Sequence, residues 1–205
     1  IRYAETMLPL ISKVFSDYTV HGIRHSINVM EYMFSLITDI DLLSELEVVL
    51  LIYGALFHDI GMVTNENEIY DIKSDNSVLG ERKYSKVFEK YGEENLSLQE
   101  CIRPVHGKRS REHIENQMDE KLFRIPNSSV VSFRDELGLI CMSHNEDFEW
   151  IEKELSNQSK KGHFEINSQY IAVLLRIADY LDIDEQRAPL YLYKYLQPKE
   201  FGDLE

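Results

Sequence analysis

The chain has little cysteine, proline or glycine, and it has no long uninterrupted apolar run. Its two cysteines lack CxxC spacing and lie in apolar contexts, which indicates reduced, buried thiols instead of a disulfide framework. With five prolines, nine glycines and no low-complexity tract or repeat, a single domain over residues 1–205 is expected. The longest apolar stretch, residues 48–57, has about half the length that crosses a bilayer, so no membrane helix is expected.

Positive charge is also scarce. The formal net charge of −14 at pH 7 makes duplex nucleic acid an unlikely partner. A hydrophobic content of 43% is enough to bury a substantial core. The sequence begins with Ile1, and its first residues do not resemble a secretion signal. We therefore expect a cytoplasmic protein and a chain that is a piece of a longer protein. Whether it forms a homo-oligomer is left open.

Apolar residues recur every three to four positions through most of the chain, which predicts an all-α fold, a helical bundle. Ser44 followed by Glu47 matches a capping box and predicts the start of a helix that leads to His58. Gly61 fits the end of this helix. The polar segment 62–81 predicts a loop or lid. Further helices are expected over residues 84–91, from about 97 to a disturbance at Pro104, over 110–118, 133–143, 147–155 and 168–181, with a short candidate strand at 130–131.

The doublet His58-Asp59 follows the apolar run, so it lies at the end of a buried helix instead of on a solvated face. His25 lies upstream at the start of another helical segment, and Asp179 lies downstream in the apolar segment LLRIADYLD. Two imidazoles and two carboxylates suit one divalent cation, and histidine favours Mn, Fe, Co, Ni or Zn over Ca. These residues are therefore candidate metal ligands around an ion that keeps positions open for water and substrate.

His25, His58-Asp59 and Asp179 resemble the signature of the HD superfamily of metal-dependent phosphohydrolases, over about residues 18–189. Each element occurs where that family has it, on three separate helical segments. The resemblance implies an HD-domain helical bundle with these residues as metal ligands, and Asp59 also as a catalytic proton acceptor. The segments YTVHGIRHS, LFHDIGM, RPVHGKRS and LLRIADYLDIDEQRAP look most similar to a bacterial subgroup often fused to a GHKL-type, heat-shock-protein-like ATPase. That similarity implies an ATPase domain in the same chain.

Two histidines between the doublet and Asp179 could extend the metal site. In a binuclear branch of the superfamily, the HD-GYP-like phosphodiesterases, extra histidines from this region hold a second metal bridged by the doublet's aspartate. His106 and His144 have the matching order, but the paired histidines and GYP tripeptide of that branch are absent, and Asn145 follows His144. One or two ions per chain are therefore both compatible with the sequence. With one ion, His106 and His144 become phosphate-facing or acid–base catalytic groups.

A basic cluster interrupts the acidic chain in the segment RPVHGKRSRE. Lys108, Arg109 and Arg111 form either a solvated helix face or a phosphate-binding surface, and the neighbouring metal motif favours phosphate binding. His21 lies in the turn before the first ligand and is a capping or substrate-binding residue. Asp182 follows Asp179 on nearly the same helix face and is a candidate hydrogen-bonding partner for a ligand. His113 lies on a charged helix and is expected at the surface.

Together these features predict a metal-dependent phosphohydrolase that cleaves a phosphoester bond of a nucleotide or related phosphate ester with a metal-activated water. Two ions favour phosphodiester cleavage, and one favours phosphomonoester or triphosphate cleavage. The expected cofactor is Mn, Fe, Co, Ni, Zn or Mg, with manganese the first to test, and the expected partner is a phosphorylated small molecule. The alternative function is a non-catalytic, nucleotide-binding sensor that regulates an attached ATPase domain. A purely structural scaffold explains the helical periodicity but not the ligand set.

Overall fold

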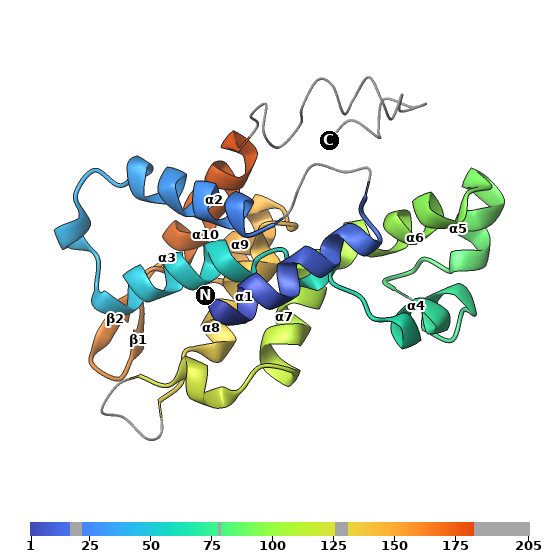
Figure 1. The fold of residues 1–205 in the computed structure, drawn as a ribbon. Coiled ribbons are helices and arrows are strands. Elements are labelled where there is room, and N and C mark those ends of the chain that lie inside the picture. Colours follow the sequence, from blue (N-terminus) through green and yellow to red (C-terminus); the bar gives the residue numbers. More distant parts are fainter. Residues whose placement is uncertain (17–21, 78, 126–130, 183–205) are drawn as a thin grey trace.

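The computed structural model describes residues 1–16, 22–77, 79–125 and 131–182 (Figure 1). Within these ranges most residues are helical, which confirms the predicted all-α class. The α-helices are α1 (Arg2–Met7), α2 (Ile23–Leu36), α3 (Glu45–Phe57), α4 (Glu66–Lys73), α5 (Tyr84–Tyr91), α6 (Glu94–Ile102), α7 (His106–Asn116), α8 (Arg134–Ser143), α9 (Phe148–Glu154) and α10 (Ser168–Leu181). Short 3-10 turns lie at η1 (Leu8–Lys13), η2 (Ile40–Leu42), η3 (Ile60–Met62), η4 (Arg103–Val105) and η5 (Glu120–Phe123).

α3 is the central helix of the bundle, and it packs against α2, α8 and α10. The predicted capping box is present at its start. Ser44 Oγ accepts a hydrogen bond from the Glu47 N–H at 3.3 Å, and Glu47 Oε2 accepts one from the Ser44 N–H at 2.7 Å. Leu50, Leu51 and Ala55 are inaccessible to solvent, as expected for a helix that is apolar around its circumference. α3 therefore carries the doublet at its C-terminal end into the interior.

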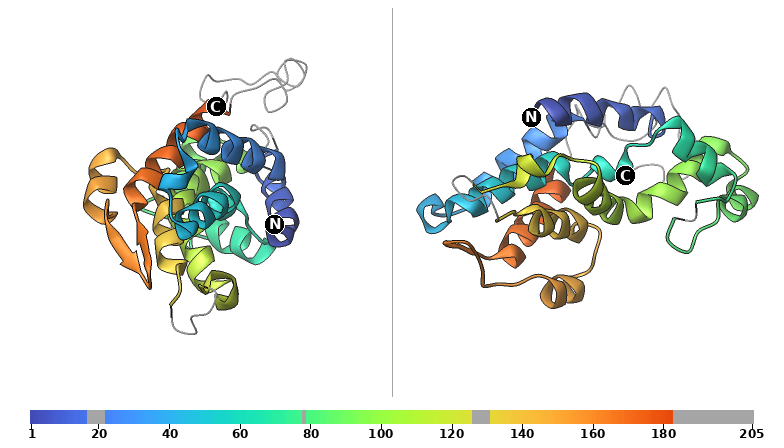
Figure 2. Two further views of the ribbon diagram at one scale, coloured as in Figure 1. Left: turned by 90° about the vertical axis from the view of Figure 1, so that its left-hand side faces the viewer. Right: turned by 90° about the horizontal axis from the view of Figure 1, so that it is seen from below.

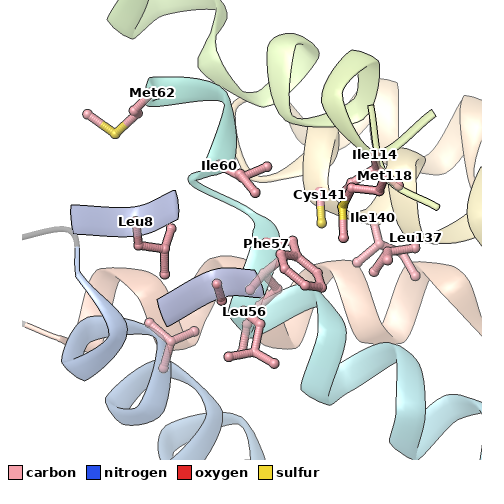
Figure 3. Close-up of a cluster of buried hydrophobic side chains, with 14 of the residues drawn as sticks. Leu8, Leu56, Phe57, Ile60, Met62, Ile114, Met118, Leu137, Ile140 and Cys141 are labelled. Carbon is pink, nitrogen blue, oxygen red and sulfur yellow. The ribbon is translucent and has the colours of Figure 1, made fainter. Parts of the chain in front are cut away.

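Apolar side chains from α7 and α8 close the core around the end of α3, as Figure 3 shows. Phe57 points toward Ile114 of α7 and Ile140 of α8. These side chains, and that of Ile60 just beyond the doublet, are at most 3% exposed. Each fully buried side chain of this size stabilises the fold by about 1.5–3 kcal/mol. The same packing fixes the ends of α7 and α8 next to the doublet.

The polar composition of the segment 62–81 predicts a loop or lid. The structure differs, because α4 occupies part of this segment. Asn65 caps α4 by accepting a hydrogen bond from the Glu68 N–H at 3.0 Å, and the buried side chain of this helix is Ile72. The asparagine, aspartate and serine residues in and around α4 favoured a loop in the sequence, since these residues are common in turns. α4 lies with α5 and α6 at one end of the molecule (Figure 1).

The other helices begin and end close to the predicted residues. α5 and α10 match the prediction to the residue, α8 starts one residue later, α9 is one residue shorter at each end, and α6 starts at Glu94 instead of near residue 97. The disturbance predicted at Pro104 is η4, which separates α6 from α7. α7 begins at His106 instead of Ser110, so the basic segment is helical from its first histidine onward.

A short antiparallel hairpin, β1 (Ser159–Lys161) and β2 (Phe164–Ile166), lies where the sequence predicts no strand. Strands of three residues are too short to show the alternation that identifies a strand. Figure 2 shows the hairpin on the outside of the bundle. The candidate strand at 130–131 lies partly outside the described residues; beside it, the Ile125 N–H donates to the Val131 carbonyl at 3.1 Å.

Among the described residues, no single helix has both the length and the apolar composition needed to cross a membrane. Glu45–Met62 and Glu66–Lys73, which form a bent pair, reach this length and apolar composition only when they are taken together.

Candidate metal centre

Ends of helices meet at the buried doublet. His58 is the C-cap residue of α3, and Asp59 follows it at the start of η3. His106 follows η4, and His144 is the C-cap residue of α8. The last carbonyls of a helix lack partners within the helix and carry partial negative charge. The C-termini of α3 and α8 therefore favour a cation at the doublet, whereas His106 and His25 come from the first turns of α7 and α2.

Three imidazoles are oriented by the same local hydrogen bond. The Nδ1–H of His58 donates to the Ala55 carbonyl at 3.1 Å, and that of His106 donates to the Arg103 carbonyl at 2.6 Å. The Nδ1–H of His144 donates to the carbonyl of Cys141, again three residues earlier. Because a carbonyl can only accept, Nδ1 carries the proton in each ring, and Nε2 is left to face the cluster.

His25, from the first turn of α2, is oriented by a carboxylate instead. Its Nδ1 lies 2.6 Å from Asp182 Oδ2, and Asp182 Oδ1 accepts a hydrogen bond from Asn28 Nδ2 at 2.8 Å. Asp182 is inaccessible to solvent. Carboxylates that receive the second N–H of a metal-binding histidine fix the orientation of the ring and raise its basicity. The structure thus gives Asp182 the contact that its position after Asp179 predicts.

The first group of ligand atoms belongs to His25, His58 and Asp179, with one oxygen of Asp59. His25 Nε2 lies 3.2 Å from Asp179 Oδ1 and 3.3 Å from Asp59 Oδ2, and His58 Nε2 lies 3.2 Å from the same Asp59 oxygen. Bond lengths of 2.0–2.2 Å to a common ion place neighbouring ligand atoms about 2.8–3.6 Å apart at octahedral or tetrahedral angles. These residues therefore fit a single divalent cation.

A second group lies on the other side of Asp59. Asp59 Oδ1 is 3.3 Å from His106 Nε2 and 3.7 Å from His144 Nε2, and the two Nε2 atoms are 2.7 Å apart. In each group the ligand atoms lie within 4.8 Å of one another. Burial, together with the neighbouring His106 and His58, lowers the pKa of His144 to about 3, so this ring is neutral at pH 7. The carboxylate of Asp59 thus faces both groups with one oxygen each.

The cluster is buried except on one side. The side chains of His25, His58 and Asp59 are at most 5% exposed, whereas that of Asp179 is 26% exposed. Asp179 comes from the last turn of α10. Solvent and small molecules therefore reach the first group from the Asp179 side.

The buried carboxylates hold protons on the first pair of histidines when no cation is present. Burial by itself lowers the pKa of His58, but the charge of Asp59 and the hydrogen bond with Asp179 raise it to about 10. Burial also lowers the pKa of His25, and hydrogen bonds with Asp179 and Asp182 raise it to about 9. Burial raises the pKa of Asp179, but hydrogen bonds from both histidines lower it well below its usual value. Two imidazolium charges thus stand where a divalent cation would supply the same charge.

The basic residues predicted to bind phosphate have partners within the protein or lie on the surface. Arg109 donates from Nε to the Gly61 carbonyl at 2.6 Å and from Nη2 to the Val63 carbonyl at 3.0 Å, and it forms an ion pair with Glu68. This guanidinium therefore fixes the segment that follows the doublet. Arg111 pairs with Glu115 at 2.6 Å. Lys108 is exposed. Substrate binding by these residues stays a prediction.

Ser110 and two glycines of this region were not singled out for the site from the sequence. Ser110 Oγ donates to the His58 carbonyl and accepts from the Gly61 N–H at 2.9 Å, so it ties both sides of the doublet to α7. A Cβ on Gly61 would lie 2.1 Å from the His106 carbonyl oxygen. The Gly107 N–H donates to Asn145 Oδ1 at 2.6 Å, which joins α7 to the end of α8. Serine, glycine and asparagine are common in turns, so their presence in the sequence carries no specific signal.

Two further histidine predictions have different outcomes. His113 was expected at the surface, but it is buried, and its Nε2 lies 2.7 Å from the Tyr3 hydroxyl. The expectation was wrong because Tyr3 of α1 covers this side of α7. α1 has only six residues, so its sequence gave no sign of this contact. His21 lies outside the described residues.

The helical bundle, with His25, the His58-Asp59 doublet and Asp179 gathered at its centre, defines an HD-type domain. A family model described as HD-CE matches residues 15–205, and the chain belongs to this HD-CE family. No curated protein and no solved structure shows a significant match to the chain. The family supports the domain type, and the arrangement of the ligands rests on the distances given above.

Proposed function

We propose that this domain is a metal-dependent phosphohydrolase that cleaves a phosphoester bond of a nucleotide or a related phosphate ester. The observation that carries the proposal is the Asp59 carboxylate, whose two oxygens face two separate groups of ligand atoms. A phosphate ester is an anion, and this chain has a net charge of −14. Bound cations at Asp59 would supply the positive charge that attracts the substrate and stabilises its reacting phosphoryl group.

The chain's own residues would hold the cation and exclude bulk water. When bound, a divalent cation lowers the pKa of water and polarises a phosphoryl oxygen. His25, His58, Asp59 and Asp179 would hold it in the first group. Asp179, as the most exposed ligand, marks the side from which water and substrate approach. The buried His58 and Asp59 form the opposite wall, so the reaction takes place where electrostatic interactions are weakly screened.

The roles of His106 and His144 depend on the number of cations. Their Nδ1 protons are held by carbonyls, so each Nε2 lone pair can bind a cation or accept a proton. With two cations, both histidines act as ligands, and an in-line cleavage of a phosphodiester is favoured. With one cation, they face Asp59 as acid–base groups, and cleavage of a phosphomonoester or a triphosphate is favoured.

The test is the Asp59→Asn variant, which keeps the shape of the side chain but removes its charge. Wild type and variant are purified without chelator and re-exposed to manganese, and metal per chain is measured by mass spectrometry. Hydrolysis of bis-p-nitrophenyl phosphate and p-nitrophenyl phosphate is followed in parallel. We expect the variant to lose metal and to lose activity by more than about a hundredfold, since even changes beyond the direct ligands can cost about that much. Helical content measured by circular dichroism should be unchanged.

The exposed Asp41→Asn is the matched control and should behave as wild type. A metal content near two ions per chain in wild type would support the two-cation arrangement if one ion is lost in His106→Gln but not in the exposed His163→Gln. Near one ion supports the one-cation arrangement. Full metal content and activity in Asp59→Asn would overturn the assignment of the site. Metal binding without hydrolysis of either probe would favour the regulatory alternative.

A further inference from the structure

A concave site lies at α5 and α6, at the end of the molecule away from α2, α8 and α10 (Figures 1 and 2). It is a cavity of about 470 Å³ lined by residues of α5, its preceding turn and α6. Cavities of this size accommodate small ligands. Its charged lining residues include Arg82, Lys83, Lys86 and Lys90, and we call it the cationic groove.

The positive charge of the groove runs against the composition of the chain. Four of the 22 lysines and arginines lie between positions 82 and 90, although the chain has a net charge of −14. Lys86 and Lys90 are four residues apart and share one face of α5, and Lys83 is the N-cap residue of the same helix. Like charges at this spacing destabilise a helix. Glu89 Oε2 lies 3.0 Å from Lys86 Nζ and balances one of these charges, and an anion in the groove would reduce the repulsion that is left.

A half-buried carboxylate organises the floor of the groove. Glu100 lies 3.6 Å from Arg82 and 3.8 Å from Arg103, and it accepts a hydrogen bond from the Tyr91 hydroxyl at 3.3 Å. Arg82 also donates to the Glu100 backbone carbonyl at 2.8 Å, which holds its guanidinium over the floor. Glu81 is the other acidic lining residue. Arg82 is thus fixed in place, whereas Lys83 and Lys86 are exposed at the rim.

The Tyr91 ring gives the groove an aromatic wall. Lys90 Nζ lies 4.4 Å from the centre of this ring and 2.8 Å from its hydroxyl oxygen. A positive side chain beside an aromatic face is suited to a ligand with an anionic part and a planar part. The lysines and Arg82 offer several N–H donors to oxygens that carry charge.

From this geometry we infer that the cationic groove is a binding site for a polyphosphate group, either inorganic or carried by a nucleotide. The site is independent of the metal centre and of the activity proposed there, because its residues come from different elements. A polyphosphate matches it better than a single carboxylate because the cationic groups are spread along two turns of α5.

The test is isothermal titration calorimetry with inorganic tripolyphosphate at low ionic strength, using chelator-treated protein so that no cation is present to attract the probe. Lys83→Glu/Lys86→Glu is the groove variant. Lys153→Glu/Lys160→Glu changes the net charge equally at exposed lysines of α9 and β1 and is the matched control. We expect the groove variant to bind at least tenfold more weakly and the control to change less than twofold. Asp59→Asn should bind as wild type, which separates this site from the metal centre.

Adenosine triphosphate, titrated in the same way, distinguishes the two sources of the group. If adenosine triphosphate binds more tightly than tripolyphosphate, and this difference in affinity disappears in Tyr91→Leu, the groove binds a nucleotide. Equal binding of the two probes assigns the polyphosphate alone, and both results support the site. No binding of either probe, an equal loss in the groove variant and the control, or binding of polyglutamate in preference to tripolyphosphate would overturn the inference.

Discussion

His25 differs from the other imidazoles of the metal centre in the group that orients it. Carbonyls orient His58, His106 and His144, whereas a buried carboxylate, Asp182, holds the Nδ1 of His25 at 2.6 Å. A backbone carbonyl cannot be removed by substitution, but this carboxylate can. Asp182 is therefore the place where the orientation of a ligand can be tested without touching the ligand.

Asp182→Asn should weaken metal binding about 10–100-fold, because its amide oxygen still accepts from His25 but no longer supplies negative charge. Metal affinity measured by competition with a chromophoric chelator checks this. The exposed Asp39→Asn serves as the control. Unchanged affinity in Asp182→Asn would mean that packing alone orients the ring.

Metal binding should release protons, and its affinity should rise with pH. Without a cation, His25 and His58 have pKa values of about 9 and about 10, so both carry a proton on the ligand side at pH 7. A cation must displace these protons, so affinity is weakened below pH 9 and the penalty disappears as pH rises through 10. Calorimetry in buffers of different ionisation enthalpy should report close to two protons released for the first ion at pH 7. Absence of any buffer dependence would contradict the charge balance described for the first group.

At the scale of elements, the turn that holds the doublet is locked onto α7 by close backbone contact. A Cβ on Gly61 would lie 2.1 Å from the His106 carbonyl oxygen and 2.4 Å from the Ser110 nitrogen, and neither backbone atom can move independently. Gly54, in α3, offers a matched comparison, because a Cβ there would meet Ile140 at 3.5 Å, an ordinary contact.

Gly61→Ala should therefore destabilise the fold by about 3 kcal/mol or more and displace the metal ligands on both sides. Gly54→Ala should be neutral or stabilise by about 0.5–1 kcal/mol, since alanine favours a helix interior. Chemical denaturation measures both free energies of unfolding. Equal stability of the two variants would show that α7 can move away from the doublet without cost.

The sequence predicted those elements whose burial leaves a periodic pattern. α10 and the start of α3 were predicted because apolar periodicity and a capping pair mark them. α4 was not, because it lies in a polar segment rich in asparagine, aspartate and serine, which favour turns. The hairpin β1–β2 was missed because three-residue strands show no alternation. Local pattern thus predicts helices marked by caps or apolar spacing, and it fails where turn-forming residues or very short strands hide the element.

For the candidate site, residue type predicted which side chains converge but not how they are held. Histidine and aspartate in a recognisable order pointed to all six side chains that the structure brings together in two groups able to hold a metal ion. Arg109 was predicted to bind phosphate, and in the structure it donates hydrogen bonds to backbone carbonyls of the segment after the doublet. A guanidinium can donate to a carbonyl as well as to a phosphate oxygen, so residue type alone does not distinguish the two. Contacts that depend on backbone atoms of distant segments leave no trace in the local sequence.

At the scale of the whole molecule, the metal centre and the cationic groove are two separate places on an acidic chain where positive charge could meet an anionic ligand. The protonated histidines, or a cation in their place, lie inside the bundle, and the cationic groove lies on the α5 side (Figure 1). Elsewhere the net charge of −14 repels anions. Anionic ligands are therefore directed toward these two places, and the salt dependence of their binding should be steep.

The charge balance at the metal centre also determines the order of events after synthesis of the chain. A buried carboxylate without a counter-charge costs several kcal/mol, which would oppose folding. In this domain the imidazolium groups of His25 and His58 offset two of the three carboxylates around them, Asp59, Asp179 and Asp182, at neutral pH. We therefore expect the domain to fold without metal, so that a cation could be taken up afterwards from whatever supply the cell then offers.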